Sequence, residues 1–207
     1  MGYSMEFIKQ GRLSTHELQI IRNDVERFKS KAVESSIYSG RSGARIDLEV
    51  RNSKIWFTTP QESKKTFNIL QTIIIENYIN FPFNFTNISS IQYANYKTGG
   101  HFKWHNDIIH EEPEEGGPAL IRSWTMSVNL SNEESYTGGE LLVRVNKEVL
   151  TLNKAPGSYA IFPAFIFHQA CMVESGERES LVVWVQSTPQ EVQNLKKLYK
   201  NNTNLHH

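Results

Sequence analysis

The chain of 207 residues is long enough for one domain with a large core and too short for two comfortable ones. Its 22 basic and 22 acidic residues cancel, so no long-range field concentrates nucleic acid or anionic lipid. No apolar run approaches the ~18 residues of a membrane span, and no basic-then-apolar signal pattern begins the sequence. A single cysteine, Cys171, excludes an internal disulfide, so we expect a cytoplasmic protein with neither nucleic acid nor membrane as partner.

Two amphipathic helices are predicted in the first part of the chain. Ser14 and Glu17 have the spacing of a capping box, and apolar residues at helical spacing follow to about Lys31. A second pattern with the same period covers residues 61–80, and Pro82 is expected to end that helix.

Short strands dominate the rest of the expected structure. A Gly- and Ser-rich turn is predicted over residues 40–43, a half-exposed strand over 46–50 and another short strand over 55–57. After the second helix, turn signals separate six more expected strands, which cover residues 88–96, 123–130, 140–145, 148–152, 158–162 and 180–186. Strands at this spacing suggest a sandwich or a jelly roll.

No internal repeat or linker divides the chain, so we expect a single domain over residues 1–207. It is mainly β with supporting α-helices. Residues 1–87 form the expected support region of helices and strands, and residues 88–187 form the β core. Residues 188–207 contain a helix, expected at 191–200, and a polar tail.

His105 and Asp107 are the first candidate functional residues, because they lie two positions apart. On a strand, alternate side chains share a face, so both can converge on one metal ion. His168 follows an apolar run, residues 162–167, that is expected to bury it nearby. Two histidines and one carboxylate with open positions opposite are typical of non-haem Fe(II) oxygenases. Taken alone, His-x-Asp occurs often by chance, and an ordinary core or surface histidine is the alternative interpretation of His105.

Two other histidines are rival ligands. His101 stands four residues before His105, a spacing that suits a zinc-binding helix, but Gly99-Gly100 disfavours a helix there. His110 lies in the acidic segment 108–118, which we expect to form a mobile loop beside the metal. We therefore assign neither histidine to the metal.

Arg178 is the second kind of candidate, a cation that can hold a carboxylate. It stands in a hydrophilic turn at the start of a strand, and Ser180, Val182 and Trp184 alternate along the same face. If that face points inward, these side chains share a pocket. An exposed turn residue is the alternative, and periodicity alone leaves the register of the strand open.

Several motifs in a fixed order resemble one enzyme family. They are Tyr96, Gly99, Phe102, His105 and Asp107, then Tyr136-Thr137-Gly138-Gly139-Glu140-Leu141, then His168, Gly176, Arg178 and Trp184. This series looks like the prolyl 4-hydroxylase-like branch of the Fe(II)/2-oxoglutarate-dependent dioxygenases, especially its compact microbial and bacteriophage members. The resemblance covers about residues 88–187, with a weaker echo at Arg51-Asn52-Ser53. It implies a double-stranded β-helix, a cupin-like jelly roll, with the N-terminal helices packed on one sheet.

The resemblance also implies roles for the candidate residues. His105, Asp107 and His168 would bind Fe(II), and Arg178 would pair with the distal carboxylate of 2-oxoglutarate. These four would form the catalytic set, with Fe(II), 2-oxoglutarate and O2 as the required cofactors and cosubstrates and ascorbate in support.

Three further residues would contact the cosubstrate if the resemblance holds. The hydroxyl groups of Tyr96 and Ser180 would assist Arg178, and Trp184 would line the cosubstrate pocket. Asn129 departs from the family pattern, because several peptidyl prolyl hydroxylases carry an aromatic residue there. This departure weakens the expectation that the target is a proline in a peptide.

The expected activity is 2-oxoglutarate-dependent hydroxylation of a prolyl or other side chain in a peptide or protein. A free amino acid or small metabolite is the alternative substrate. From a different class, the domain could be a non-catalytic sensor that binds 2-oxoglutarate and metal. A zinc hydrolase is a third option, but it would not explain the presence of Arg178.

Overall fold

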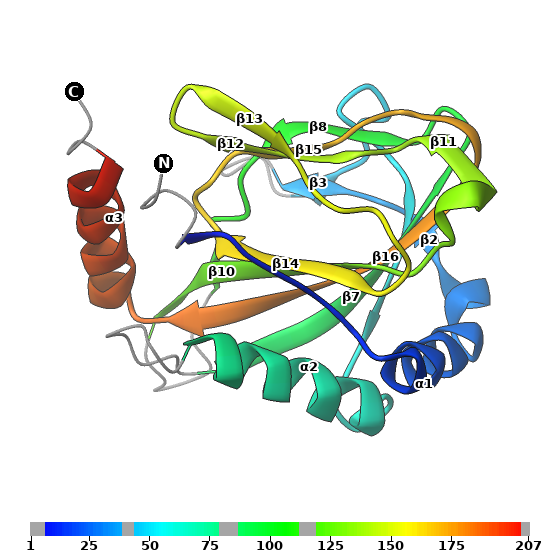
Figure 1. Cartoon of the computed structure of the whole chain (residues 1–207), viewed down its shortest axis with the longest axis horizontal. Coiled ribbons are helices and arrows are strands. Elements are labelled where there is room, and N and C mark those ends of the chain that lie inside the picture. The colour runs from blue at the N-terminus through cyan, green and yellow to red at the C-terminus, as the bar shows by residue number, and fades with distance from the viewer. Residues whose placement is uncertain (1–6, 39–43, 79–86, 112–118, 204–207) are drawn as a thin grey trace.

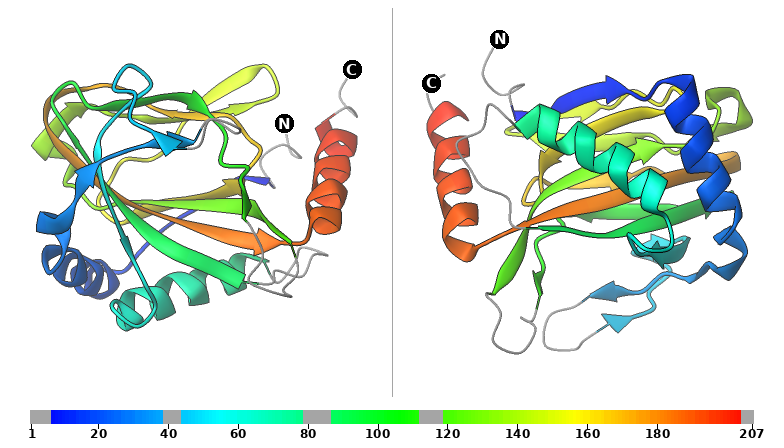
Figure 2. Two further views of the ribbon diagram at one scale, coloured as in Figure 1. Left: turned by 180° about the vertical axis from the view of Figure 1, so that it is seen from behind. Right: turned by 90° about the horizontal axis from the view of Figure 1, so that it is seen from below.

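The computed structural model describes residues 7–38, 44–78, 87–111 and 119–203. Two antiparallel sheets face each other, and two helices cover the outer face of the larger sheet (Figure 1). A third helix, α3 (Pro189–Thr203), lies at one end of the sandwich in all views (Figure 2). The expected mainly β fold with helices packed on one sheet is therefore confirmed. Within the described part of the chain, no helix has the length and apolarity of a membrane-spanning segment.

The larger sheet has nine strands. Seven are ordered β1 (Lys9–Arg12), β14 (Ser158–Pro163), β10 (Leu120–Asn129), β16 (Val173–Ser187), β7 (Asn87–Lys97), β6 (Lys54–Thr58) and β2 (Val33–Glu34). Two short strands flank this series, β9 (His110–Glu111) beside β10 and β11 (Tyr136–Gly138) beside β16.

The smaller sheet has five strands, and the segments that bear the candidate histidines form its centre. Their order is β13 (Glu148–Thr151), β12 (Leu141–Val145), β15 (His168–Ala170), β8 (His101–His105) and β5 (Arg51–Asn52). The remaining strands of the described residues form a separate pair, β3 (Ile37–Tyr38) and β4 (Ala44–Arg45). Two short 3-10 turns, η2 (Lys29–Lys31) and η4 (Glu133–Ser135), are also present.

The two predicted N-terminal helices exist, with shorter bounds than expected. The first, α1 (Thr15–Glu26), begins at the capping box of Ser14 and Glu17 and gives way to η2 instead of continuing to Lys31. The second, α2 (Lys64–Tyr78), starts three residues late because Thr59 and Glu62 form their own turn, in which Thr59 N–H donates to Glu62 Oε2. The predicted turn at 40–43 and the helix stop at Pro82 lie outside the described residues.

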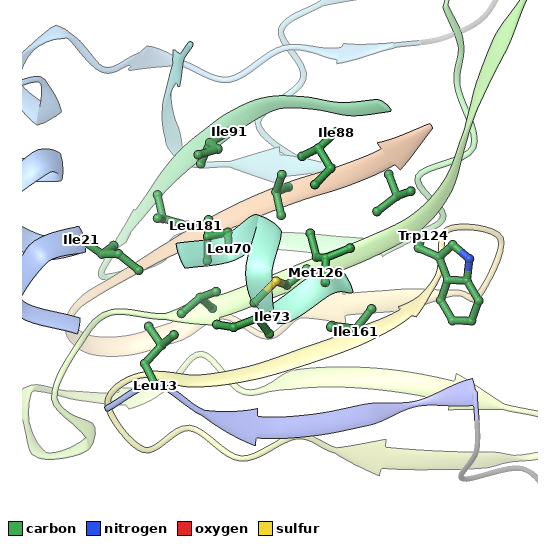
Figure 3. Packing of buried hydrophobic residues seen from close by; sticks show 14 of the residues in the cluster. Leu13, Ile21, Leu70, Ile73, Ile88, Ile91, Trp124, Met126, Ile161 and Leu181 are labelled. Atoms are coloured by element: carbon green, nitrogen blue, oxygen red, sulfur yellow. The ribbon is translucent and has the colours of Figure 1, made fainter. Parts of the chain in front are cut away.

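Alternation along the strands of the larger sheet decides which side chains face the helices. Leu181, Val183 and Val185 of β16 are buried in the main core with residues of α1 and α2. Figure 3 shows Leu70 and Ile73 of α2 among the apolar side chains of this sheet. Because side chains alternate, Arg178, Ser180, Val182 and Trp184 must face the other sheet. Helix packing thus fixes the register that the sequence pattern leaves open.

The predicted strand at residues 46–50 is wrong. Residues 48–50 form a turn, in which Asp47 Oδ1 accepts from Glu49 N–H and the Asp47 carbonyl accepts from Arg51 N–H. Ile46 and Leu48 are exposed, so their alternation with charged residues does not mark a sheet face. An aspartate that binds its own following backbone favours a turn over a strand.

Candidate active site

His105, Asp107 and His168 come together between the two sheets. His105 ends β8 and lies opposite His168, the first residue of β15, across the antiparallel pair. Asp107 follows two residues later, and its backbone N–H donates to the Ala164 carbonyl at 2.8 Å. One potential ligand atom from each of the three residues lies within 4.8 Å of the others. Two imidazoles and one carboxylate in this arrangement form a donor set that fits Fe(II).

Backbone carbonyls orient both imidazole rings. His105 Nδ1 lies 2.7 Å from the Lys103 carbonyl, and His168 Nδ1 lies 3.1 Å from the Ile166 carbonyl. A carbonyl only accepts, so each Nδ1 carries a proton and donates, and in the neutral form of each ring Nε2 then keeps the lone pair. The two Nε2 atoms are 3.7 Å and 3.4 Å from the carboxylate oxygens of Asp107. This pattern of hydrogen bonds prepares both rings to ligate a metal through Nε2.

Two hydrogen-bond donors on the larger sheet hold the carboxylate of Asp107. Thr125 Oγ1 donates to Asp107 Oδ2 at 2.8 Å, and Trp184 Nε1 donates to the same oxygen at 3.0 Å. Their bonds leave Oδ1 available to a metal. Asp107 is only 8% exposed, so these donors also satisfy an oxygen that water cannot reach freely.

The charge state of the cluster follows from burial and mutual contact. Burial and the nearby His168 lower the pKa of His105 to about 3, which keeps this imidazole neutral. Burial raises the pKa of Asp107, but the combined effect of His168, His105 and the hydrogen bonds lowers it overall. Burial lowers the pKa of His168, but its contact with Asp107 raises that pKa overall. The site therefore holds an ionised carboxylate beside a neutral histidine at neutral pH, as metal ligation requires.

A cavity of about 430 Å³ adjoins the three residues. This volume is in the range of small-molecule sites. The inward face of β16 lines it with Arg178, Ser180, Val182 and Trp184, and Thr125 lies opposite Trp184 on β10. The cavity thus extends along the strands from the His-Asp-His cluster to Arg178.

Arg178 is buried in the wall of this cavity, with 4% of its surface exposed. Nη1 lies 3.4 Å from Ser180 Oγ, and the guanidinium carbon lies 5.5 Å from the centre of the Tyr96 ring. Among the described residues, no carboxylate pairs with it. A buried guanidinium without a counter-charge is unfavourable unless a ligand supplies one.

The Tyr136–Leu141 motif explains how the chain passes close to Arg178. Gly139 has φ +66°, and a Cβ atom there would lie 3.2 Å from Arg178 Cδ and from Tyr136 Cε2. Only glycine combines this backbone conformation with that approach. The motif thus packs directly behind the arginine side chain.

The rival histidine His101 lies apart from the cluster. Its ring nitrogens approach the carbonyls of Gly99 and Glu49, each at 3.1 Å. The side chain of His110 and residues 112–118 lie outside the described part of the structure. Cys171 is half-buried, and burial raises the pKa of its thiol, which favours the inert form.

Several lining residues had no signal strong enough to assign them from sequence. Arg51 appeared only as a weak echo of the family pattern, and Gln92, Thr125 and Arg122 were not assigned. They come from β5, β7 and β10, far apart in the sequence, and no local motif links them. The inward positions of β7 and β10 could have indicated Gln92 and Thr125, had the register been known.

Comparison with known proteins agrees with the fold and the donor set. The sequence profile of the 2OG-Fe(II) oxygenase superfamily matches residues 91–186. A PKHD-type hydroxylase of Pseudomonas putida is 32% identical over 93 residues, which cover 44% of this chain and 41% of that protein. The chain thus matches about two fifths of the length of this relative.

Solved structures show the same fold. A prolyl-4-hydroxylase of Pseudomonas putida has a TM-score of 0.67 at 14% identity, covering 87% of this chain and 93% of the other. A prolyl hydroxylase of Trichoplax adhaerens, in complex with a hypoxia inducible factor peptide, has a TM-score of 0.69 at 14% identity, covering 92% and 87%.

A jelly roll with a buried His-Asp-His cluster is typical of the non-haem iron oxygenases. Over residues 91–186 the chain is similar to the 2OG-Fe(II) oxygenase superfamily, and it has the fold of the prolyl-4-hydroxylase structures. Fe(II), 2-oxoglutarate and O2 are the cofactors and cosubstrates of that superfamily, and the donor set of this chain fits the metal.

Proposed function

We propose that the protein is a Fe(II)- and 2-oxoglutarate-dependent hydroxylase of a prolyl or other side chain in a peptide or protein. One atom of O2 enters the substrate C–H bond as a hydroxyl group, and the other enters succinate. The 2-oxoglutarate loses its C1 carboxylate as carbon dioxide. The two-electron oxidation of the substrate and the oxidative decarboxylation together account for the four electrons that reduce O2.

His105, Asp107 and His168 hold the Fe(II) in this proposal. The close approach of their ligand atoms, within 4.8 Å, is the observation that carries it. Bound iron with 2-oxoglutarate supplies the oxidising chemistry. The protein fixes the ligands by the carbonyls behind each imidazole and by the two donors on Asp107. A metal held by these three residues would keep open positions for the cosubstrate and oxygen.

Arg178 binds the distal carboxylate of 2-oxoglutarate. It is a buried cation on the cavity wall, with a hydroxyl group at Ser180 and the Tyr96 ring beside it. A guanidinium gives a carboxylate two parallel hydrogen bonds, a geometry that lysine does not offer. Trp184 lines the same cavity, where its main task is the hydrogen bond to Asp107.

We further propose that residues 1–207 act as one domain, with the support region, the core and the C-terminal helix as its parts. Leu195 of α3 shares the main core with α1, α2 and the larger sheet, which supports this view. A peptide substrate is supported by the structural neighbour from Trichoplax adhaerens, which holds a peptide fragment.

Succinate formation tests the proposal. Purified protein with Fe(II), ascorbate and 2-oxoglutarate, incubated with and without proline-containing peptides, is expected to produce succinate. Mass spectrometry of the peptides is expected to show a gain of one oxygen atom. Binding of 2-oxoglutarate without succinate in any condition would instead indicate a non-catalytic sensor.

A further inference from the structure

We propose that the prime substrate carries a carboxylate near the carbon that is hydroxylated, and that Arg51 binds this carboxylate. The inference rests on the proposed function, because it concerns the second molecule in the same cavity. The carboxylate belongs either to an acidic side chain in a peptide or to the free α-carboxylate of an amino acid.

Arg51 is a second buried cation on the cavity wall. It lies on β5 in the smaller sheet, whereas Arg178 lies on the larger one, and only 7% of its surface is exposed. Its Nε donates to Ser53 Oγ at 3.0 Å, and its Nη2 donates to Gln92 Oε1 at 2.8 Å. Both acceptors are neutral. A guanidinium has five N–H donors, so three remain for a ligand.

The formal charges of the cavity favour a further anion. With iron and cosubstrate bound, the charges of Fe(II), Asp107, 2-oxoglutarate and Arg178 sum to zero. Arg51 then adds one positive charge that nothing in this sum offsets, and arginine does not lose its proton in proteins. The third arginine of the cavity wall, Arg122, is half-buried and its guanidinium carbon lies 3.7 Å from the centre of the Trp184 ring. Asp107 is the one carboxylate among the described residues that line the cavity. A carboxylate on the prime substrate supplies the missing charge.

The position of Arg51 places such a carboxylate near the metal ligands. The guanidinium carbon lies 4.6 Å from the centre of the Phe102 ring. The Phe102 ring also stacks on the imidazole of His105, with ring centres 3.4 Å apart and planes 15° apart. A carboxylate on Arg51 therefore lies one aromatic ring away from a metal ligand, so the oxidised carbon is a short distance from the charged group.

The apolar residues of the cavity wall indicate what the rest of the substrate is like. Apolar side chains of the same cavity wall come from residues 50–57 and from the segment after Asp107; they are Val50, Ile55, Phe57, Ile108 and Ile109. These side chains suit a compact aliphatic carbon skeleton. A proline with a free carboxylate, or a proline followed by aspartate, combines both features.

Two matched pairs of compounds test the inference. The first pair is proline and prolinamide; the second is a short peptide with Pro-Asp and the same peptide with Pro-Asn. The readouts are the change in succinate formation, whether stimulation or competitive inhibition, and the gain of oxygen by mass spectrometry. We expect the carboxylate member of one pair to act at a concentration at least about tenfold lower than its amide partner. The pair whose acid and amide differ in this way shows whether the carboxylate is that of a free amino acid or of an aspartate side chain.

Variants assign the discrimination to Arg51. In Arg51→Gln we expect the carboxylate and amide members to act at equal concentrations, and in Arg51→Lys we expect a partial preference. Arg45→Gln is the matched control, because Arg45 is exposed and pairs with Asp47 outside the cavity. Thermal unfolding and Fe(II) binding confirm that each variant is folded.

The outcomes separate the two proposals. Suppose that the wild type forms succinate, but that the acid and the amide of each pair change succinate formation equally or not at all. This result overturns the carboxylate inference and leaves the hydroxylase proposal standing. A preference that persists in Arg51→Gln also overturns it. No succinate under any condition contradicts the hydroxylase proposal itself and the inference with it.

Discussion

Thr125 and Trp184 lie directly opposite each other on β10 and β16, and both donate a hydrogen bond to Oδ2 of Asp107. One cross-strand pair of the larger sheet therefore fixes the carboxylate of Asp107, which lies in the segment directly after β8 of the smaller sheet. The arrangement links the two sheets at the proposed metal site and directs Oδ1 of Asp107 away from its protein donors. Such supporting hydrogen bonds set the orientation and basicity of a metal ligand.

Removing either donor is expected to weaken iron binding without unfolding the protein. Trp184→Phe and Thr125→Val each keep most of the side-chain volume and delete one hydrogen bond to Asp107. Loss of such a partner lowers metal affinity by about 10- to 100-fold. Anaerobic titration with Fe(II) measures the effect. Trp104→Phe is the control, because Trp104 contacts Arg144 and not Asp107; an equal loss in that variant would contradict the assigned role.

Arg178→Ala is expected to raise the requirement for 2-oxoglutarate far more than the requirement for iron. A buried carboxylate that loses its cationic partner costs about 3–5 kcal/mol. The corresponding loss of affinity is about 10²- to 10³-fold or more. The KM for 2-oxoglutarate and the Kd for Fe(II) are measured in the same preparation. The exposed Arg144→Ala serves as control, and equal effects on both ligands would mean that Arg178 only supports the fold.

Gly139→Ala is expected to affect both stability and cosubstrate binding. The positive φ of Gly139 disfavours any side chain by about 1–2 kcal/mol. Its new Cβ atom would also press on Arg178 Cδ, 3.2 Å away. Gly99→Ala is a matched control, since Gly99 has φ +83° but open space around the added atom. Urea unfolding should show a loss in both variants, whereas only Gly139→Ala should raise the KM for 2-oxoglutarate.

The capping box of α1 is expected to make part of the stability dependent on pH. The hydrogen bonds from Ser14 lower the pKa of Glu17 in the folded protein. A group whose folded pKa is lowered contributes stability above its unfolded pKa, and this contribution disappears as the pH falls through the folded pKa. Ser14→Ala should therefore cost about 0.5–2 kcal/mol at pH 7. Urea unfolding from pH 7 to pH 3 should show the difference from wild type shrinking below about pH 4; a constant difference would contradict this role.

The sequence indicated the class of fold and the proposed metal ligands, because those signals are local. The two-residue spacing on a strand, the apolar run before His168 and the order of the motifs led to both predictions. The register of β16 was not accessible in this way, since it depends on which face packs against α1 and α2. For the same reason, Thr125 could not be linked to Asp107 from the sequence.

Local side-chain chemistry explains the clearest error. The alternation over residues 46–50 predicted a strand, but Asp47 binds the backbone that follows it and forms a turn. Arg51, directly after that turn, enters the cavity as the first residue of β5. Its contacts with Gln92 and Phe102 join segments that are far apart in the sequence, so no pattern of spacing could reveal them.

The most direct test is the stoichiometry of Fe(II) binding under anaerobic conditions. The wild type is expected to bind one Fe(II) per chain, and adding 2-oxoglutarate should produce the charge-transfer absorption of a 2-oxo acid chelated to Fe(II). His168→Ala is expected to bind no iron and to lack this absorption, whereas His101→Ala should behave as the wild type does. If His168→Ala kept one Fe(II) per chain, the three side chains from β8, β15 and the segment after β8 would not be the metal ligands.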